Sequence, residues 1–191
     1  MSQYDLAKSI FSRAFSNETF VSQSAELWQG DFPLPEAVAN YYFDLGASDV
    51  SIESYGNPIF LPSLSRLWEH QIGYRYHGLT GERIEDWDDD WLVIADEGAD
   101  PFIYSRSSGT ILYAFHGQGE WQPSELFSDL PAMVTSFAIL GEIVVSAGND
   151  FTDEDSYINE RFIIAAKEEL SCVLNSEVKA EVVLETFGWS R

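Results

Sequence analysis

Acidic residues between positions 86 and 102 have the spacing of a calcium-binding loop. This segment, DWDDDWLVIADEGADPF, contains six aspartates and one glutamate. The residues at positions 1, 3, 5 and 12 of an EF-hand-like loop are Asp86, Asp88, Asp90 and Glu97. Trp91 stands at position 6, where such a loop needs glycine for its sharp turn, and the LVIA that follows is typical of a strand. We therefore expect no metal at this segment.

Phosphodiester hydrolysis with a divalent metal is a second possible chemistry. Glu177 and Lys179 form an E-x-K pair on a segment that could be a strand, and Asp150, Asp153 and Asp155 precede them. Such carboxylates can hold Mg²⁺ while the lysine lies near the scissile phosphate. The pair is common by chance, however, and a formal net charge of −22 repels a nucleic acid. A metal-dependent hydrolase is therefore the least favoured interpretation.

Nucleophilic catalysis has little support in the sequence. The chain contains neither a G-x-S-x-G motif nor a P-loop. Its single cysteine, Cys172, lies beside the apolar face of a predicted helix, so we expect a buried, unreactive side chain. His70, His77 and His116 lack the close spacing of metal ligands on one element. We therefore predict a protein that is not an enzyme, with no catalytic residue, no metal and no cofactor.

The acidic residues flank runs that predict β-strands. These runs, separated by the glycine-containing turn signals DEGAD and RSSG, are WLVIA (91–95), FIYS (102–105) and TILYAF (110–115). Because they are almost continuously apolar, we expect strands that are covered on both faces. Ile94, Phe102 and Leu112 are accordingly predicted to be core residues, and the flanking acids are expected to lie on exposed loops.

The remaining apolar residues mostly have helical spacing. A short strand is predicted at 59–61, directly before a helix that Ser63 could cap. The segments predicted to be helical are 3–15, 20–28, 34–46, 63–68, 130–148 and 158–174. In the tail, 176–189, alternating apolar residues favour a strand whereas strong helix formers favour a helix, so both remain open.

The composition bounds the kind of protein and the kind of partner. The chain has 191 residues, of which 45% are hydrophobic and 15% aromatic, so it can form one domain with a sizeable core. Its formal net charge of −22 disfavours nucleic acids and anionic membranes as partners. The same charge favours association with basic proteins.

The sequence carries no sign of export. A single cysteine cannot form an intramolecular disulfide, which fits a reducing compartment. The first residues, MSQYDLAKSIFSRAF, lack the basic and apolar regions of a signal peptide. The apolar runs are expected to be too short to span a membrane. We therefore predict a soluble cytoplasmic protein.

The order of these segments resembles the SUKH superfamily, which unites a fungal cell-wall-synthesis regulator with many bacterial immunity proteins. The resemblance covers roughly residues 34–145, through LP, IFLPSLSRLW, WLVIADEGADPFIYSRSSGTILYAF and TSFAIL. Its most specific part is a strand ending near Ile-Ala, a turn of the Asp-x-Gly-Gly-Asp type and a second strand. The residues that fit this part are Ile94, Ala95, Asp96, Gly98, Asp100, Phe102 and Ile103. Ala99 replaces the usual second glycine.

The resemblance implies a single-domain α+β fold with a mixed or antiparallel central sheet and packed helices. It places a SUKH-like core domain at 31–148, between an N-terminal helical segment (1–30) and a C-terminal helical extension packed on the core (149–191). It also implies a non-enzymatic immunity protein that binds and neutralises a polymorphic toxin, often a nuclease or a deaminase. An intracellular scaffold or regulator with a non-toxin partner is the alternative.

The acidic stretch is then a candidate docking surface for a basic toxin. From Glu82 to Asp100 the chain carries nine acids and one base, Arg83, so the local net charge is −8. This charge could mimic nucleic-acid phosphates, and Trp87 could anchor the centre of the interface. The residues predicted to contact the partner are Glu82, Glu85, Asp86, Trp87, Asp88, Asp89, Asp90, Asp96, Glu97 and Asp100. The oligomeric state does not follow from the sequence.

Overall fold

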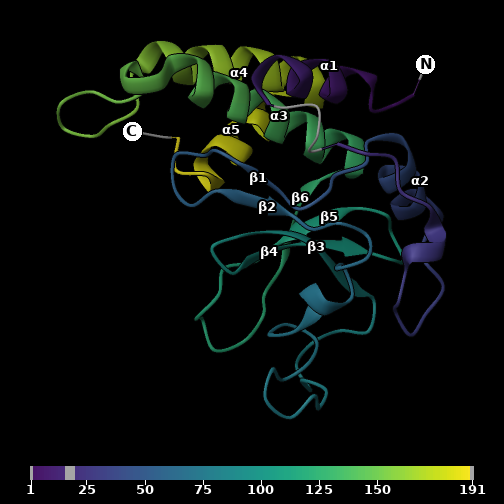
Figure 1. Cartoon of the computed structure of the whole chain (residues 1–191). Helices are drawn as coiled ribbons and strands as arrows, with labels where there is room; N and C mark the ends of the chain where they lie inside the picture. Colours follow the sequence, from purple (N-terminus) through teal and green to yellow (C-terminus); the bar gives the residue numbers. More distant parts are fainter. Residues whose placement is uncertain (1, 16–19, 190–191) are drawn as a thin grey trace.

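A six-stranded antiparallel sheet lies at the centre of the computed structural model, which describes residues 2–15 and 20–189 (Figure 1). The strands are neighbours in chain order, and each pairs antiparallel with the next. They are β1 (Val50–Ile52), β2 (Ile59–Leu61), β3 (Trp91–Glu97), β4 (Asp100–Ser105), β5 (Ile111–Tyr113) and β6 (Ser124–Phe127). A mixed or an antiparallel sheet is expected from the sequence, and the observed sheet is antiparallel.

Helices cover one face of this sheet (Figure 1). Those in this layer are α1 (Asp5–Ala14), α3 (Leu130–Ala147), α4 (Glu160–Leu174) and α5 (Glu177–Thr186). A further helix, α2 (Glu36–Asp44), lies beside the sheet. Short 3-10 helices are η2 (Ala25–Leu27), η3 (Glu69–Gln71) and η4 (Gly148–Asp150). The protein is a single α+β domain, as predicted. Residues 1 and 16–19 of the expected N-terminal segment, and residues 190–191 of the expected C-terminal extension, lie outside the described residues.

α3 is the central helix of the covering layer. Asp129 caps its N-terminus by accepting a hydrogen bond from the N–H of Ala132 at 2.8 Å, and Pro131 suits its first turn. By length and composition alone, Leu130–Asp150 could span a membrane, so the expectation that every apolar run is too short is wrong. The most apolar stretch of Leu130–Asp150 is 56% buried inside the protein, which is typical of a core helix.

The main hydrophobic core lies between the helices and the sheet. Phe102 on β4 packs against Phe137 of α3 and against Phe187, with ring centroids 4.8 and 5.8 Å away. Ile94 and Phe102 are fully buried, which confirms their prediction as core residues. Leu112 is only partly buried and lies on the opposite face of the sheet, so its prediction as a full core residue is wrong.

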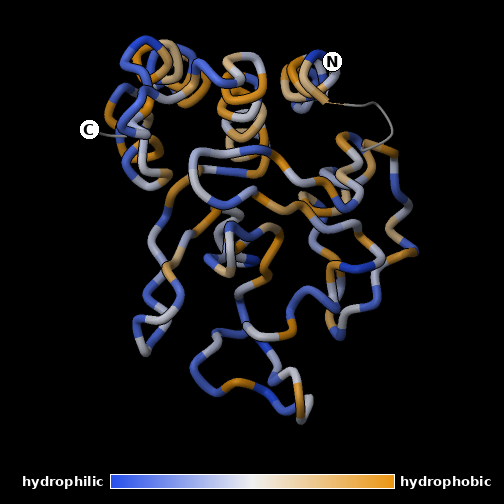
Figure 2. The backbone as a smooth tube through the Cα atoms, turned by 60° about the vertical axis from the view of Figure 1, so that its left-hand side comes forward, coloured by the Kyte–Doolittle hydropathy of each residue, from blue (hydrophilic) through white to orange (hydrophobic). Residues whose placement is uncertain are grey.

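The opposite face carries a second, smaller hydrophobic cluster, formed by Tyr74, Trp87, Val93 and Ile103. Residues 62–90 cover it with turns and one 3-10 helix instead of an α-helix. The central strands are therefore covered on both faces, as predicted. Figure 2 shows that the loops below the sheet are largely hydrophilic, whereas hydrophobic residues concentrate in the strands and the helices.

The predicted helix at 20–28 is not formed. Phe20 makes an isolated bridge with Ala47, and helical structure is limited to η2. β1 and β6 are absent from the prediction because strands of three and four residues give too short an alternating pattern.

The predicted helix at 63–68 is also not formed, because Ser63 has another hydrogen-bond partner. Its hydroxyl donates to the Asp49 carboxylate at 3.1 Å, and its N–H donates to the second carboxylate oxygen at 3.0 Å. The residues after it form turns that lead into η3. Asp49 thus competes with the helix cap that the sequence predicts.

The tail is helical. Ser176 caps α5 by accepting a hydrogen bond from the N–H of Lys179 at 3.2 Å. Glu177 and Lys179 consequently lie in the first turn of a helix, so the strand that a metal-dependent hydrolase would have used is not formed. Cys172 on α4 is exposed, and the expectation of a buried thiol is wrong.

Candidate functional site

A buried glutamine holds the irregular segment 62–90 on the sheet. The side-chain amide of Gln71 donates to the carbonyl of Val93 at 2.8 Å and accepts from the N–H of Val93 at 3.0 Å. It also donates to the carbonyl of Leu67 at 2.8 Å. Because β2 pairs only with the far end of β3, the glutamine takes the place of a strand at Val93. This attachment positions the neighbouring residues His70 and Tyr74 over the sheet.

Asp89 is a structural centre of the acidic segment, which we define as residues 82–90. Its carboxylate lies 3.0 Å from the guanidinium of Arg75 and 2.5 Å from that of Arg83. Its carbonyl accepts from Arg106 at 2.7 Å. Arg75 is only 4% exposed, so Asp89 neutralises a buried charge. Asp89 therefore pairs with two arginines within the protein, although its side chain is 77% exposed.

Asp88 and Asp90 also shape the chain where it enters β3. The carboxylate of Asp88 accepts from the N–H of Asp90 at 2.8 Å. The carboxylate of Asp90 accepts from the hydroxyls of Ser105 and Ser107 at 2.6 and 3.0 Å. Asp90 thus holds the start of β3 against the end of β4, and Asp88 shapes the turn before it. Both lie on a loop, as predicted, and Asp88 is exposed.

Three other acids of the segment remain available to a partner. Glu82, Glu85 and Asp86 are exposed, and their side chains make no ion pair or hydrogen bond within residues 2–15 and 20–189. We call these three residues the free acids. Their neighbours in the chain are held by the Asp89 contacts, so the free acids project from an ordered base.

Trp87 lies under the acidic segment instead of on its surface. Its side chain is 2% exposed. Its ring packs against Trp91, Trp121 and Tyr74 at centroid distances of 5.2, 5.4 and 5.7 Å. A buried ring offers no contact area to a partner, so this structure does not support Trp87 as an interface anchor. Its role here is to pack the second hydrophobic cluster.

The hairpin between β3 and β4 places two more of the predicted acids beside histidines. Asp96 Oδ2 lies 2.9 Å from Nε2 of His70, although the two groups lack the alignment of a hydrogen bond. Asp100 Oδ1 lies 2.5 Å from Nδ1 of His116, whose backbone N–H also donates to it at 2.7 Å. Both acids belong to strands and are half-buried, so they do not lie on an exposed loop as expected.

Glu97 is the most buried acid of the predicted set, with 8% of its surface exposed. It faces Asp100 across the hairpin. Burial, with the charge of Asp100 as a second cause, raises the pKa of Glu97 to about 7. Its carboxyl therefore carries only part of a negative charge at neutral pH. In the turn between them Ala99 adopts a φ of 82°, the left-handed conformation expected of the glycine that it replaces.

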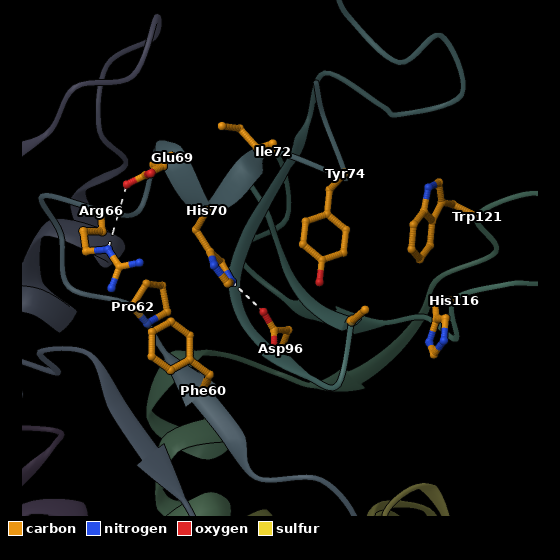
Figure 3. A pocket seen from close by; sticks show the side chains of 12 residues that line it. Phe60, Pro62, Arg66, Glu69, His70, Ile72, Tyr74, Asp96, His116 and Trp121 are labelled. Atoms are coloured by element: carbon orange, nitrogen blue, oxygen red, sulfur yellow. Dashed lines mark ion pairs between the residues drawn. The ribbon is translucent and has the colours of Figure 1, made fainter. Parts of the chain in front are cut away.

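A hollow of about 530 Å³ opens between segment 62–90, the β3–β4 hairpin and the loop after β5 (Figure 3). Phe60, Tyr74 and Trp121 supply aromatic wall. The charged or titratable residues that line it are Arg66, Glu69, His70, Asp96 and His116. Tyr74 and Trp121 also pack against Trp87, so the hollow and the acidic segment share one aromatic wall.

Tyr74 places a hydroxyl at the wall of the hollow. The residue is 7% exposed, and within the described residues its hydroxyl has no hydrogen-bond partner. Figure 3 shows it pointing toward the gap between Asp96 and His116. Burial first, and then the charges of Asp96 and Asp100, raise its pKa above the ordinary value, so the hydroxyl keeps its proton. A ligand in the hollow would meet this hydroxyl.

The hollow provides groups for binding a polar ligand. His70 and Asp96 could exchange a proton with such a ligand, but no serine, threonine or cysteine lines the hollow to act as a nucleophile. Across the part of the chain that the structure describes, no group of three His, Cys, Asp or Glu side chains could hold a metal ion.

Tyr74 is not predicted as a site residue from the sequence, Trp121 is considered only as one of the tryptophans that could form an interface hot spot, and His70 only as a possible metal ligand. These residues come from separate segments, and they meet because segment 62–90 folds back over β3. Contacts between such segments leave no regular spacing in the sequence. The one local signal is the aromatic-rich stretch WEHQIGYRY at 68–76.

Comparisons with known proteins identify no relative of this chain. No protein-family model matches it, and no curated protein or solved structure is significantly similar to it. The resemblance to the SUKH superfamily therefore stays a prediction from the quoted residues.

Proposed function

We propose that the protein is a non-enzymatic binding module, an immunity protein that binds and neutralises a basic toxin of the nuclease or deaminase class. The observation that carries the proposal is the position of Glu82, Glu85 and Asp86. These free acids project from a loop that the Asp89 ion pairs hold in place, on the side of the sheet without covering α-helices. The SUKH resemblance and the net charge of −22 support the same proposal.

The electrostatic reasoning concerns the rate at which the partner binds. Exposed charges at the rim of an interface mainly accelerate encounter with an oppositely charged protein, and salt screens them. The Asp89 ion pairs hold the loop that carries the free acids, so less conformational entropy of the loop is lost when the partner docks. A nuclease or deaminase presents a basic surface for phosphates, and the free acids would compete for that surface.

The intracellular scaffold remains the alternative, because it would use the same surface with another basic partner. We propose a cytoplasmic location for the protein, whether it is an immunity protein or a scaffold. The metal-dependent hydrolase is not supported, because its E-x-K pair lies on a helix and not on a strand.

The deciding experiment uses the neighbouring gene. The C-terminal domain that this gene encodes is expressed in a host cell with and without the protein, and growth is measured. We expect the domain to stop growth, the protein to restore it, and the two purified proteins to form a complex. A neighbour that has no toxicity and does not bind the protein would overturn the immunity proposal and favour the scaffold.

A further inference from the structure

We propose that the hollow is a receptor for one alkylguanidinium group, such as the side chain of an arginine that a basic partner presents. The source of that arginine rests on the proposed function, whereas the binding of the guanidinium itself does not. Three observations carry the inference. They are the aromatic wall, the carboxylate of Asp96 that is not aligned for a hydrogen bond with His70, and the unpaired hydroxyl of Tyr74.

The aromatic wall suits a flat cation. The rings of Tyr74 and Trp121 lie 5.9 Å apart between centroids with an interplanar angle of 52°, and Phe60 contributes a further face. A guanidinium stacks on such faces and is more weakly hydrated than an ammonium, so it loses less on entering. The volume of about 530 Å³ lies within the range of small-ligand sites and is sufficient for an arginine side chain.

The polar groups complete the receptor. Asp96 lies close to His70, but the missing hydrogen-bond alignment leaves carboxylate oxygens able to accept from a guanidinium. Such pairs can form two parallel hydrogen bonds. The hydroxyl of Tyr74 projects into the same space and can accept a further N–H. Tyr74 is 7% exposed, and within the described residues its hydroxyl has no hydrogen-bond partner, so this ligand would supply one.

The charges around the hollow select a cation over an anion. Among the described residues that line the hollow, Arg66 is the one permanently positive side chain, and it already lies 3.4 Å from Asp49 and 3.9 Å from Glu69. Asp96 has only a histidine beside it, and the charge of Asp100 also reaches Tyr74. A positive ligand is therefore attracted to the inner end of the hollow.

The test titrates the purified full chain with N-acetyl-L-arginine methylamide, followed by NMR or calorimetry. N-acetyl-L-citrulline methylamide is the matched ligand, because it has nearly the same shape without the charge. We expect the arginine probe to bind with a Kd on the order of 1 mM and the citrulline probe at least about 10-fold more weakly. Equal binding of the two probes, or no binding of either, overturns the inference.

Variants locate the binding. Asp96→Asn should weaken binding of the arginine probe by about 10-fold or more, and Tyr74→Phe by about 3-fold or more, because each removes one acceptor without changing the size of the side chain. Glu120→Gln is the control, since it removes an exposed charge nearby that does not line the hollow. If Asp96→Asn fails to fold, Tyr74→Phe alone tests the inference, because removing the hydroxyl preserves the packing of the ring. Unchanged binding in Tyr74→Phe and Asp96→Asn overturns the inference.

A competition arm identifies the source of the guanidinium. Saturating arginine probe should slow binding of the toxin domain if a toxin arginine enters the hollow. Probe binding without competition supports a free small-molecule guanidinium and overturns the partner arginine. A toxin domain that binds while the probe does not overturns this inference and leaves the proposed function standing.

Discussion

The carboxylate of Asp89 lies 3.0 Å from the guanidinium of Arg75, which is buried beneath the acidic segment. Arg75 is also held over the rings of Phe32 and Trp68, at 5.5 and 5.7 Å from their centroids. One of the acids predicted to contact a partner is thus part of the framework that gives the surface its shape. The acids of the segment have two different roles, and variants can separate them.

Asp89→Ala should destabilise the fold by about 1–2 kcal/mol. Removing one partner of a fully buried ion pair costs about 3–5 kcal/mol, but Asp89 itself is exposed and Arg75 keeps carbonyl acceptors at Asp89 and Trp91, so we expect less. Urea denaturation measures the difference. Asp86→Ala is the control, since this free acid should change stability by less than about 0.5 kcal/mol. Equal stability of the two variants would show that the ion pair does not stabilise the fold.

Glu97 should make stability fall as the pH rises. Its pKa is about 7 in the folded protein and near 4.5 in an ordinary environment, so the folded state binds the proton more tightly. The stability present below pH about 4.5 is then lost as the pH rises through about 7. One pKa unit corresponds to about 1.4 kcal/mol, and partial screening at the hairpin reduces the total to roughly 1–3 kcal/mol.

Glu97→Gln tests this pH dependence, because glutamine resembles the protonated carboxyl. Above pH about 7 the variant should be more stable than the original protein, and the advantage should disappear near pH about 4.5. Urea denaturation from about pH 4 to about pH 8, at about one-unit steps, gives both curves. Glu85→Gln serves as an exposed control. Parallel curves for Glu97→Gln and the original protein would contradict the raised pKa.

Ile94→Ala and Leu112→Ala should differ in cost, because the two side chains lie on differently covered faces of the sheet. Ile94 is fully buried in the main core, so its truncation should cost about 2–5 kcal/mol. Leu112 is partly buried at the second cluster, and its truncation should cost about 1–2 kcal/mol. Urea denaturation checks both values. A cost below about 0.5 kcal/mol for Ile94→Ala would contradict its burial.

The strands β2 to β5 and most helices follow from local pattern, whereas β1, β6 and the site do not. WLVIA and FIYS predict β3 and β4 because apolar runs that flank a glycine-containing turn fit few other structures. Segment 62–90 has no such pattern, since its order comes from single contacts such as Gln71 with Val93, 22 positions apart. Trp87 shows why local pattern misleads. Its acidic neighbours indicate an exposed segment, but its ring turns inward against Trp121.

Replacing the free acids should slow association with the toxin domain. The variant carries Glu82→Gln, Glu85→Gln and Asp86→Asn, which remove three charges without touching the Asp89 contacts, so its urea denaturation should be unchanged. We expect the on-rate to fall by about 3- to 10-fold at 0.05 M salt and the difference to shrink above about 0.15 M, where the screening length is about 8 Å.

A matched control separates local docking from the overall charge of the protein. Glu168→Gln, Glu177→Gln and Glu185→Gln remove the same number of charges from exposed positions outside the acidic segment. Stopped-flow or biosensor kinetics should show little change for this control, because exposed charges beyond the screening length contribute weakly to encounter. If both triple variants slow association equally, only the overall net charge attracts the partner. If neither does, the partner docks away from residues 82–90, and the acidic connector around Asp150 to Asp155 becomes the next surface to test.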